Sequence, residues 1–440
     1  MPTLAIVLGY AIAAALFAVA YAYVGYPVVI WVLSRLFGRP PVRPAVPDED
    51  LPRLSLLIAA YNEAGHIEER VRNALAMDYP PGKLEIVIAS DGSSDDTADI
   101  VREFSSRGVR VLDFKTRRGK SSVLNEVIPL CTGEVVMLSD ANTLTDPDAA
   151  RKLAAWFADP AVGVVCGKLV LIDPADGRNV DGVYWKYETF LKLCESRLGA
   201  LLGSNGGIYA VRQSAFRPIP ADTIVDDFVL PLLARQETGC RIVYDKQAVA
   251  TEETPSSIAS EFQRRARIGA GGFQAIGLLR GLTHPRHGWL AFAFVNHKLL
   301  RWASPFLLIF ALLGNLLWVV LCMPYVGNVF HLPWAALALA LQVGFYVSSL
   351  LAGMLPARPK IFKLFRLPAM FTSMNAALAV GFWRWLRGRQ NSAWARTDRG
   401  GNLVTAGDTG RYAPAAETTE TPSVVMLRKS AERQAVRQAS

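Results

Sequence analysis

The sequence has 440 residues, of which 51% are hydrophobic and only 19% carry a charged side chain. Soluble domains usually contain about 25% charged residues, so this composition disfavours a plain soluble enzyme and excludes a disordered, fibrous or small disulfide-linked chain. Lys and Arg exceed Asp and Glu by 47 to 38, which gives a net charge of +9. The length suits two or three domains of about 150 residues each.

The N-terminal run from Met1 to Ser34 contains no charged side chain. About 20 apolar residues are enough to cross a bilayer, so the run predicts one tilted transmembrane helix within residues 1–37. A cleaved signal peptide has basic residues before its apolar run, and no Lys or Arg precedes this one. Arg35 and Arg39 follow it. Because basic residues favour the cytoplasmic side, we expect the N-terminus outside and the next domain inside.

The middle of the chain has the pattern of an α/β domain. A Pro-rich stretch over residues 38–52 predicts a stiff linker. Residues 53–282 then alternate short apolar runs with helical patterns, which predicts a single cytoplasmic domain. Connections of a dozen or more residues between its strands favour parallel pairing. The predicted strands begin at Leu54, Leu84, Arg110 and Val135.

Acidic or polar side chains follow these strands where the chain turns. Glu63, Asp91 and Asp140 are examples. In open parallel sheets, ligands bind beyond the carboxyl ends of the strands, so these side chains predict one shared site. No G-x-G-x-x-G follows the first strand and no G-x-x-x-x-G-K-[ST] occurs, which disfavours a hydride-transfer or phosphate-loop enzyme.

Asp140 and Asn142 lie two positions apart at a strand end and carry the oxygen ligands that a hard divalent cation prefers. Such a cation would neutralise a diphosphate, and Lys120 and Arg267 would add positive charge. Taken alone, an Asp-x-Asn in a loop is more often a turn or a helix cap.

A second hydrophobic region covers residues 283–390. Uncharged runs over 305–325 and 332–355 predict a transmembrane hairpin whose tip faces outward. The stretch 287–302 before it carries Lys298 and Arg301 among aromatic residues, which predicts an interfacial helix.

The last hydrophobic run, residues 367–383, is long enough to span a membrane but has basic clusters on both sides. Both flanks favour the cytoplasm, so an in-plane or re-entrant helix is preferred to a fourth crossing. The basic tail, residues 391–440, is expected to be largely disordered. Five scattered cysteines show no metal-type or disulfide spacing and are expected to be buried thiols in a reducing compartment.

Six short motifs occur in a fixed order along residues 54–280. They are Ala59-Ala60-Tyr61-Asn62-Glu63, Ser90-Asp91-Gly92-Ser93-Ser94-Asp95, Arg118-Gly119-Lys120, Asp140-Ala141-Asn142, Gly203-Ser204-Asn205-Gly206-Gly207 and Asp226-Asp227. In this order they resemble the family-2 glycosyltransferases, most closely the membrane-bound branch of cellulose, chitin, hyaluronan and poly-N-acetylglucosamine synthases. The resemblance implies a Rossmann-like, glycosyltransferase A-type α/β domain with a mostly parallel sheet, plus transmembrane and interfacial helices.

The resemblance also implies how a nucleotide-sugar is held. Tyr61 and Glu63 would edge the nucleobase pocket, and Asp91 would contact the uracil or the ribose. Asp140 with Asn142 takes the place of the family's Asp-x-Asp, which holds Mg²⁺ or Mn²⁺ on the diphosphate. Because Asn142 is a neutral ligand, the resemblance implies a weaker metal affinity than usual.

Asp227 falls at the position of the family's general base, and Asp226 replaces the Glu of a Thr-Glu-Asp-type motif. On its own, such a pair would more often be the acidic first turn of a helix. The implied reaction is inverting transfer, in which Asp227 takes the proton of an acceptor hydroxyl as its oxygen attacks the anomeric carbon. Lys120 and Arg267 would hold the charge of the leaving nucleoside diphosphate.

The sequence departs from the family in its Gln-x-x-Arg-Trp motif, where Arg267-Ile268 stands in place of Arg-Trp and Arg264 in place of Gln. Ile268 offers no flat face for an acceptor sugar, which argues against long-chain processivity. A basic face attracted to anionic lipid is an equal explanation of Arg264 and Arg265.

The acceptor is assigned to four residues. Trp185 and Glu188, on a helix predicted over 183–198, would line its channel together with Asn205 and Asp226. Packing against the membrane helices explains Trp185 equally well.

The predicted function is inverting transfer of a hexosyl or N-acetylhexosaminyl group from a UDP-linked sugar to a growing extracellular polysaccharide or oligosaccharide. Two alternatives stay open: transfer of one sugar to a membrane lipid, or a non-catalytic nucleotide-binding subunit of an export complex. The expected partners are the donor, a carbohydrate or lipid acceptor, the membrane and export-complex subunits. Nucleic acid is not expected, because the basic residues flank membrane segments. The expected location is the plasma (inner) membrane, with the catalytic domain in the cytoplasm.

Overall fold

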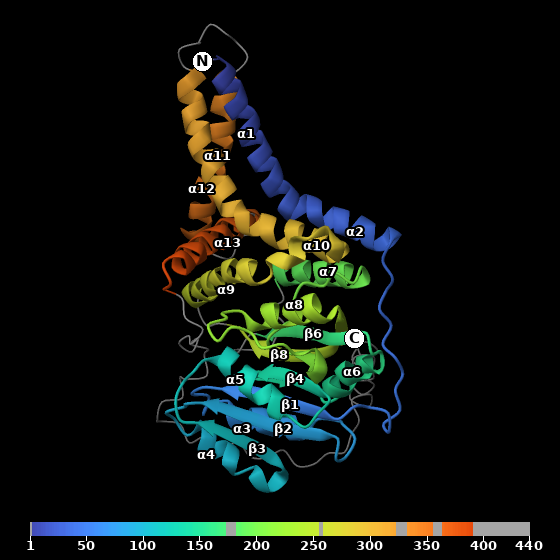
Figure 1. Ribbon diagram of the computed structural model, residues 1–440. Helices are drawn as coiled ribbons and strands as arrows, with labels where there is room; N and C mark the ends of the chain where they lie inside the picture. Colours follow the sequence, from blue (N-terminus) through green and yellow to red (C-terminus); the bar gives the residue numbers. More distant parts are fainter. Residues whose placement is uncertain (1, 173–181, 255–257, 323–331, 355–362, 390–440) are drawn as a thin grey trace, which may run out of the picture. The chain divides into compact units, whose positions relative to one another are not determined.

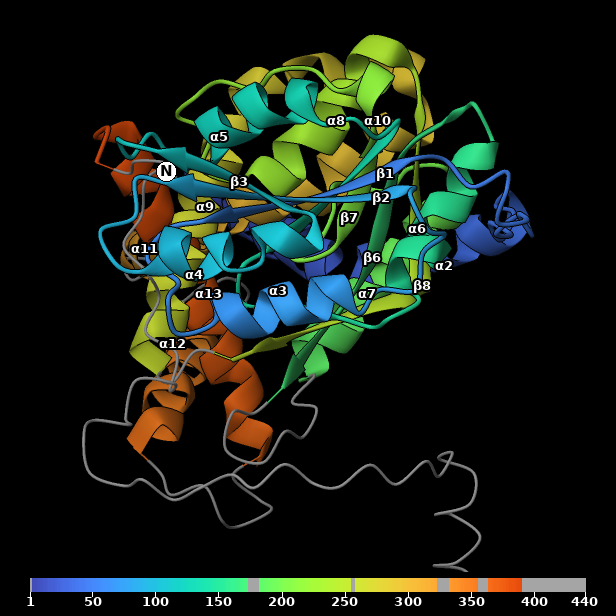
Figure 2. The same cartoon turned by 90° about the horizontal axis from the view of Figure 1, so that it is seen from below.

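The computed structural model describes residues 2–172, 182–254, 258–322, 332–354 and 363–389. The tail expected to be disordered, residues 391–440, lies outside the described residues. Among these residues, eight strands form one sheet in the order β3-β2-β1-β4-β7-β6-β8-β5, and helices cover both of its faces (Figure 2). The expected α/β class is confirmed.

The first half of the sheet is parallel. Its strands pair in the order β3-β2-β1-β4, and residues Ala59 and Asp140 lie side by side at the ends of β1 and β4. The carboxyl ends of these strands therefore meet at one edge, as the sequence predicted. The bounds are β1 (Leu54–Ala60), β2 (Leu84–Asp91), β3 (Val109–Phe114) and β4 (Val135–Asp140).

The second half of the sheet is mixed. Strand β7 runs antiparallel to both β4 and β6, while β6 and β8 are parallel and the short β5 is antiparallel to β8. With four parallel and three antiparallel pairs, the parallel pairs keep a narrow majority. The bounds are β5 (Thr143–Thr145), β6 (Val162–Ile172), β7 (Tyr209–Arg212) and β8 (Arg241–Glu253).

Helices pack on the two faces of the sheet because successive strand residues point to opposite sides. In β1, Leu56 and Ile58 face one hydrophobic core, whereas Leu57 faces the other. Helices α3, α4 and α6 cover the first core and α5 and α8 cover the second (Figure 2). The bounds are α3 (Ile67–Leu75), α4 (Thr97–Arg102), α5 (Lys120–Val127), α6 (Ala149–Ala155) and α8 (Asp226–Thr238).

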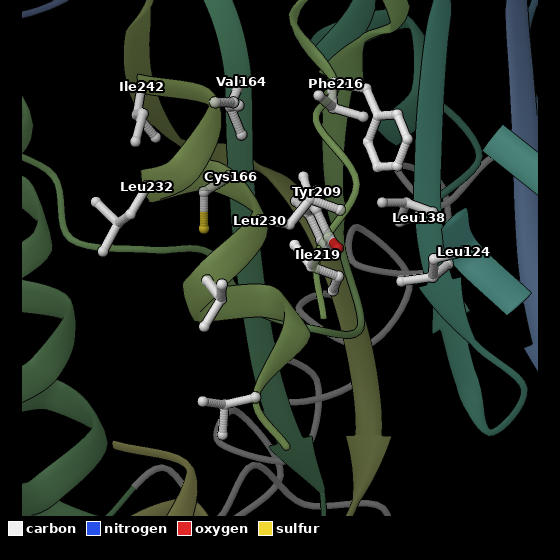
Figure 3. Packing of buried hydrophobic residues seen from close by; sticks show 14 of the residues in the cluster. Leu124, Leu138, Val164, Cys166, Tyr209, Phe216, Ile219, Leu230, Leu232 and Ile242 are labelled. Atoms are coloured by element: carbon white, nitrogen blue, oxygen red, sulfur yellow. The ribbon is translucent and has the colours of Figure 1, made fainter. Parts of the chain in front are cut away.

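The second core fixes helix α8 on the sheet. Figure 3 shows Leu230 and Leu232 of α8 lying against Val164 and Cys166 of β6, with Tyr209 of β7 beside them. All five side chains are fully buried. Burying a Leu or Val side chain contributes about 1.5–3 kcal/mol, so this packing holds the acidic first turn of α8 at a defined place on the sheet.

In the part of the chain that the structure describes, three helical stretches are long and apolar enough to cross a membrane: Thr3–Leu36, Trp289–Cys322 and Trp334–Ala352. Helices α1 (Pro2–Ala20), α11 (Leu300–Cys322) and α12 (Leu332–Met354) rise together from the rest of the chain (Figure 1). A Cβ on Gly9 would lie 2.8 Å from the ring of Trp318, so the glycine permits close packing of α1 on α11.

Two of these stretches bend at a short π-helical turn. Tyr21–Gly25 joins α1 to α2 (Tyr26–Leu36), and Phe294–Leu299 joins α10 (Trp289–Ala293) to α11. Figure 1 shows α2 and α10 lying across the base of the rising helices. The one helix expected over residues 1–37 is therefore bent, and the interfacial helix expected over 287–302 continues into α11.

Helices α2 and α13, from the two hydrophobic regions of the chain, pack against helices α7 and α9 of the region between them. Helix α2 buries Tyr26 and Ile30 against α7 (Val183–Arg197). Helix α13 (Lys363–Leu386), which covers the run expected to lie in the membrane plane, packs along α9 (Ile258–Leu278). A Cβ on Gly381 would lie 2.5 Å from the carbonyl oxygen of Ala266, so the two backbones nearly touch. Within the described residues, α13 is not among the stretches long and apolar enough to span a membrane.

Candidate functional site

A cavity of about 470 Å³ lies at the carboxyl ends of β1, β2 and β4 and extends to the membrane helices. Every residue that the sequence assigned to the site lines it. They come from the ends of β2 and β4, the loops that follow β1 and β4, the loop before β7 and helices α5, α7, α8 and α9, which the chain order alone does not place together. The set is Tyr61, Glu63, Asp91, Lys120, Asp140, Asn142, Trp185, Glu188, Asn205, Asp226, Asp227 and Arg267.

The first end of the cavity is built by two loops that bind each other. Asn62, with φ of 53°, donates its backbone N–H to Ser93 Oγ (3.1 Å) and accepts a hydrogen bond from the backbone N–H of Ser94 at its Oδ1 (2.8 Å). This fixes the neighbouring Tyr61. The guanidinium of Arg117 stacks 3.7 Å from the centre of the Tyr61 ring. Sequence reasoning missed Arg117, for which the only signal was its place beside the Arg118-Gly119-Lys120 motif.

Asp91 organises the loop that presents Lys120. Its Oδ1 and Oδ2 each accept a hydrogen bond of 2.8 Å, from the backbone N–H groups of Arg118 and Gly119. Gly119 has φ of 92°, which a residue with a Cβ rarely adopts. The loop can therefore turn sharply into α5, whose first residue is Lys120. The contact of Asp91 with a uracil or a ribose stays a prediction.

Lys120 bridges two carboxylates from different elements. Its Nζ lies 2.8 Å from Asp140 Oδ1, at the end of β4, and 3.2 Å from Asp226 Oδ2, in the first turn of α8. Burial alone would lower the pKa of Lys120, but the two carboxylates outweigh it and raise the pKa above its usual value. The ammonium therefore stays charged and holds β4 and α8 together across the cavity.

Asp227 has the electrostatics of a proton acceptor. Burial and the neighbouring Asp226 together raise the pKa of its carboxyl to about 6, against the opposing effect of Lys120. The backbone N–H of Ser204 donates to the Asp227 carbonyl oxygen (2.9 Å), which ties the Gly-rich loop to α8. A Cβ on Gly206 would lie 3.3 Å from Asp227 Oδ2 and 3.5 Å from Asp140 Oδ2. The absent side chain leaves room between these two carboxylates.

Asp140 and Asn142 are the predicted oxygen ligands of a divalent cation, and both line the cavity. Within the described residues, no group of three or more His, Cys, Asp or Glu side chains is arranged to hold a metal ion. Mg²⁺ is commonly bound by only one or two carboxylates plus substrate phosphates, so this smaller set still fits. The buried Nδ2 of Asn142 makes no hydrogen bond within the described part of the chain, which leaves the amide available to turn its oxygen into the cavity.

Helix α9 contributes the basic wall. Burial lowers the pKa of Arg267, and Arg264 adds to the shift. Arg264 and Arg265 both pair with Glu261 at 2.7 Å. All three arginines line the cavity, and so does Ile268, which stands in the place of the family's Trp. The basic face is therefore directed partly into the site and is not only a lipid-facing surface.

Helix α7 joins the cavity to the membrane helices. Glu188 forms an ion pair with Arg301 of α11 and lies 3.6 Å from His297 Nε2. Burial alone would raise the pKa of Glu188, but the guanidinium of Arg301 and a hydrogen bond from His297 hold it well below its usual value. Two turns further, Glu195 Oε1 lies 2.6 Å from His297 Nδ1 and accepts a 2.9 Å hydrogen bond from the Tyr26 hydroxyl. Glu188 thus binds helices together as well as lining the cavity.

Sequence reasoning also missed Lys192 as a cavity residue, and it treated Lys298 and Arg301 only as basic residues of an interfacial helix. All three line the cavity. A signal was present: Lys192 lies four positions after Glu188 on one helix, so the two share a face. Lys298 and Arg301 lie three positions apart, so they also share a helix face.

Residues 55–218 match the family model described as Glycosyl transferase family 2. The chain is 27% identical over 298 residues to poly-beta-1,6-N-acetyl-D-glucosamine synthase of Staphylococcus aureus. The match covers 65% of this chain and 67% of that protein. It is 28% identical over 236 residues to the protein of the same name from Staphylococcus epidermidis, covering 51% and 55% of the two chains.

The fold is similar to that of the mannosyltransferase PcManGT from Pyrobaculum calidifontis, solved in complex with GDP-Man and Mn²⁺. The TM-score is 0.63 at 22% sequence identity, covering 86% of this chain and all of that one. At this identity the likeness concerns the fold, and it agrees with the glycosyltransferase A-type architecture expected from the motifs.

Proposed function

We propose that the chain is a glycosyltransferase whose catalytic domain includes residues 55–218, and that it transfers a hexosyl or N-acetylhexosaminyl group from a UDP-linked sugar with inversion. The acceptor would be a growing oligosaccharide or polysaccharide destined for the cell exterior. The catalytic domain would lie on the cytoplasmic side of the plasma membrane, where nucleotide-sugars are made.

The observation that carries this proposal is the raised pKa of the Asp227 carboxyl. A carboxyl whose pKa is raised to about 6 is ionised at neutral pH yet basic enough to accept a proton in the transition state. It lies beside Gly206, where no side chain fills the space toward Asp140. The acceptor oxygen would occupy that space and lose its proton to Asp227 as it bonds to the anomeric carbon.

The remaining charges suit a nucleoside diphosphate. Lys120 and Arg267 would stabilise the negative charge that develops on the leaving group, because both line the cavity. Tyr61, with Arg117 stacked on its ring, would form the wall of the nucleobase pocket. Asp140 and Asn142 would hold Mg²⁺ or Mn²⁺, which supplies positive charge to the diphosphate.

A second candidate acceptor is a membrane lipid that receives one sugar. Two observations favour it: the cavity reaches Trp302 of α11 and Met374 of α13, and Ile268 stands where a stacking Trp would be expected. The third possibility is a non-catalytic subunit of an export complex. The presence of both Lys120 and Asp227 in the cavity argues against it.

The proposal is tested with purified protein and Mg²⁺ or Mn²⁺ by measuring nucleotide release from UDP-glucose, UDP-N-acetylglucosamine, UDP-galactose and GDP-mannose. We expect release from at least one UDP-sugar and loss of release in Asp227→Asn. Mass spectrometry of the products then distinguishes sugar chains from a single glycolipid, and the anomeric configuration reports inversion. Release from GDP-mannose alone would refute the UDP donor, and equal release by Asp227→Asn would refute the base.

A further inference from the structure

Arg70 of α3 is a charged side chain enclosed in the protein interior. None of its surface is exposed, and its helix neighbours Ile67, Val71 and Ala74 belong to the first hydrophobic core. Its Nη1 donates a hydrogen bond of 2.8 Å to Asn73 Oδ1, whereas its Nε and Nη2 make no hydrogen bond within the described residues. A buried cation with unpaired N–H groups destabilises a fold, so packing alone does not explain an arginine at this position.

The charge of Arg70 acts on the loop that follows β4. Burial lowers the pKa of the Arg70 guanidinium to about 10, and the carboxylate of Asp140 opposes the shift. The side chain therefore stays charged at neutral pH. Asn73, its hydrogen-bond partner, accepts a 3.0 Å hydrogen bond from the backbone N–H of Thr145 and donates one of 2.9 Å to the carbonyl oxygen of the same residue. The guanidinium is thus fixed against residues 140–145, the segment that contains both predicted metal ligands.

Arg70 acts from behind the wall of the cavity. It is not among the described residues that line the cavity, unlike Lys120 and Arg267, whose charges also act on Asp140. A ligand in the cavity therefore meets the electric field of Arg70 and not its side chain. Salt screens a buried charge much less than an exposed one, so this field reaches the cavity. Asn142 acts in the same direction, because its amide adds no negative charge to the loop.

We propose that Arg70 is a positioning residue for the donor, whose buried charge weakens the binding of a divalent cation at Asp140 and strengthens the binding of the nucleoside diphosphate. The part that concerns the diphosphate rests on the proposed function, whereas the part that concerns the cation does not. A cation at Asp140 is repelled by Arg70 across the carboxylate that attracts it. The negative charge of a diphosphate is attracted by the same guanidinium. The cation is therefore expected to bind mainly together with the donor.

The experiment measures two affinities that a positive charge changes in opposite directions. Full-length protein in a neutral detergent is titrated with Mn²⁺ alone, and free Mn²⁺ is followed by electron paramagnetic resonance. A second titration, with UDP in the presence of EDTA, is followed by calorimetry. In Arg70→Met, which removes the charge and keeps an unbranched side chain, we expect the Kd for Mn²⁺ to fall and the Kd for UDP to rise. At the effective dielectric constant of a partly buried site, loss of one unit charge predicts a change of about tenfold in each Kd.

Two further substitutions of Arg70 separate its charge from its packing. Arg70→Gln is a second neutral replacement and is expected to change both affinities as Arg70→Met does. Arg70→Lys keeps the charge and is expected to have affinities close to those of the wild type. Differential scanning fluorimetry checks that each variant is folded.

Three variants at other positions serve as controls. Arg72→Met removes an arginine from the same helix whose side chain is 60% exposed, and it is expected to leave both affinities unchanged. Asn73→Ala removes the hydrogen bonds to Thr145 without removing a charge, and it is not expected to tighten Mn²⁺. Asp140→Asn removes the charged ligand and measures the Mn²⁺ that binds elsewhere on the protein.

A purely structural role of Arg70 predicts a different result, because a loosened segment 140–145 would bind both ligands less tightly. Weaker binding of both Mn²⁺ and UDP in the two neutral variants would therefore overturn the inference, and so would unchanged affinities in both. If UDP binds to neither the wild type nor any variant while Mn²⁺ binds more tightly to Arg70→Met, the effect on the cation is supported and only the proposed UDP donor is contradicted. Unchanged affinity for Mn²⁺ in Arg70→Met, in a protein that releases UDP from a UDP-sugar, contradicts only the inference.

Discussion

At the scale of single residues, the site is organised by carboxylates in different electrostatic surroundings. Asp140 and Asp226 face Lys120, whereas Asp227 lies behind them with a pKa raised to about 6 by burial. Gly206 leaves open space beside two of them. The arrangement separates a charge-binding group from a proton-accepting one, as acid–base sites commonly do.

The raised pKa of Asp227 predicts the pH dependence of activity. We expect kcat/KM to fall below about pH 6, where the carboxyl gains a proton, and to level off above it. Asp227→Asn should lower kcat about 10²–10⁴-fold across the range, as loss of a general base commonly does. Asp222→Asn, an exposed acid before the same helix, should keep the wild-type profile. A profile that does not change between pH 5 and 8 would contradict the assignment.

The same group predicts a gain in stability when it is replaced. Because the folded-state pKa of Asp227 is raised, the folded chain binds the proton more tightly than the unfolded chain does. Ionisation of Asp227 therefore destabilises the fold as the pH rises from about 4 to about 6. Asp227→Asn should have a higher Tm than the wild type at pH 7.5 and an equal Tm near pH 4. Differential scanning fluorimetry at both pH values measures the difference, and a lower Tm at pH 7.5 would contradict the buried ionised carboxylate.

The buried pair of Arg301 and Glu188 predicts a loss of stability. Their side chains are only 7% and 12% exposed. Removing one partner of a buried ion pair costs about 3–5 kcal/mol, because the other charge is left without compensation. Arg301→Met should therefore lower the Tm in detergent clearly, and Arg301→Met with Glu188→Leu should recover part of the loss. A double variant no more stable than Arg301→Met would show that packing, and not charge, dominates.

At the scale of elements, the first four strands could be predicted from the sequence and the bends could not. Strand β1 reads as an apolar run bounded by polar residues, and its pairing with β2 and β4 brings the motif residues to one edge. The direction in which α2 leaves α1 is set instead by contacts far along the chain, such as Tyr26 with Glu195. Hydrophobicity alone does not encode that direction. The spacing of Lys192 from Glu188 already placed the two on one helix face, but only the packed structure brings Lys192 and Lys298 to the same cavity.

The contact between α9 and α13 predicts a specific sensitivity. A Cβ on Gly381 would lie 2.5 Å from the Ala266 oxygen and 2.7 Å from the Ala270 nitrogen, so Gly381→Val must push the helices apart. Since Arg267 and Ile268 of α9 line the cavity, we expect a higher KM and a lower Tm. The KM is measured by nucleotide release and the Tm by differential scanning fluorimetry.

Gly277→Ala is the matched control, because a Cβ at this α9 position meets nothing within 4 Å. It should be as stable as the wild type or slightly more so, since Ala favours helices. Equal Tm and KM in Gly381→Val and the wild type would contradict the close packing of α13 on α9.

At the scale of the whole molecule, basic residues and candidate spans together predict an orientation. Arg35 lies at the C-terminal end of the first candidate span, Thr3–Leu36, and basic residues favour the cytoplasmic side. We expect Thr3→Cys to react with a membrane-impermeant maleimide in intact cells, whereas Lys246→Cys, on the exposed surface of β8, should react only after lysis. The wild type, whose cysteines are buried or half-buried, gives the background. Labelling of Lys246→Cys in intact cells would contradict a cytoplasmic domain.

The cavity that runs from Tyr61 to Leu378 also has a practical consequence for biochemistry. In a bilayer, which the length and apolar composition of the stretch containing α11 permit, the end near Trp302 would lie closer to the alkyl chains than the end near Tyr61. A detergent used for extraction therefore becomes a potential competitor at one end only. A surfactant that binds there should inhibit with respect to the acceptor and leave the apparent affinity for the nucleotide-sugar unchanged.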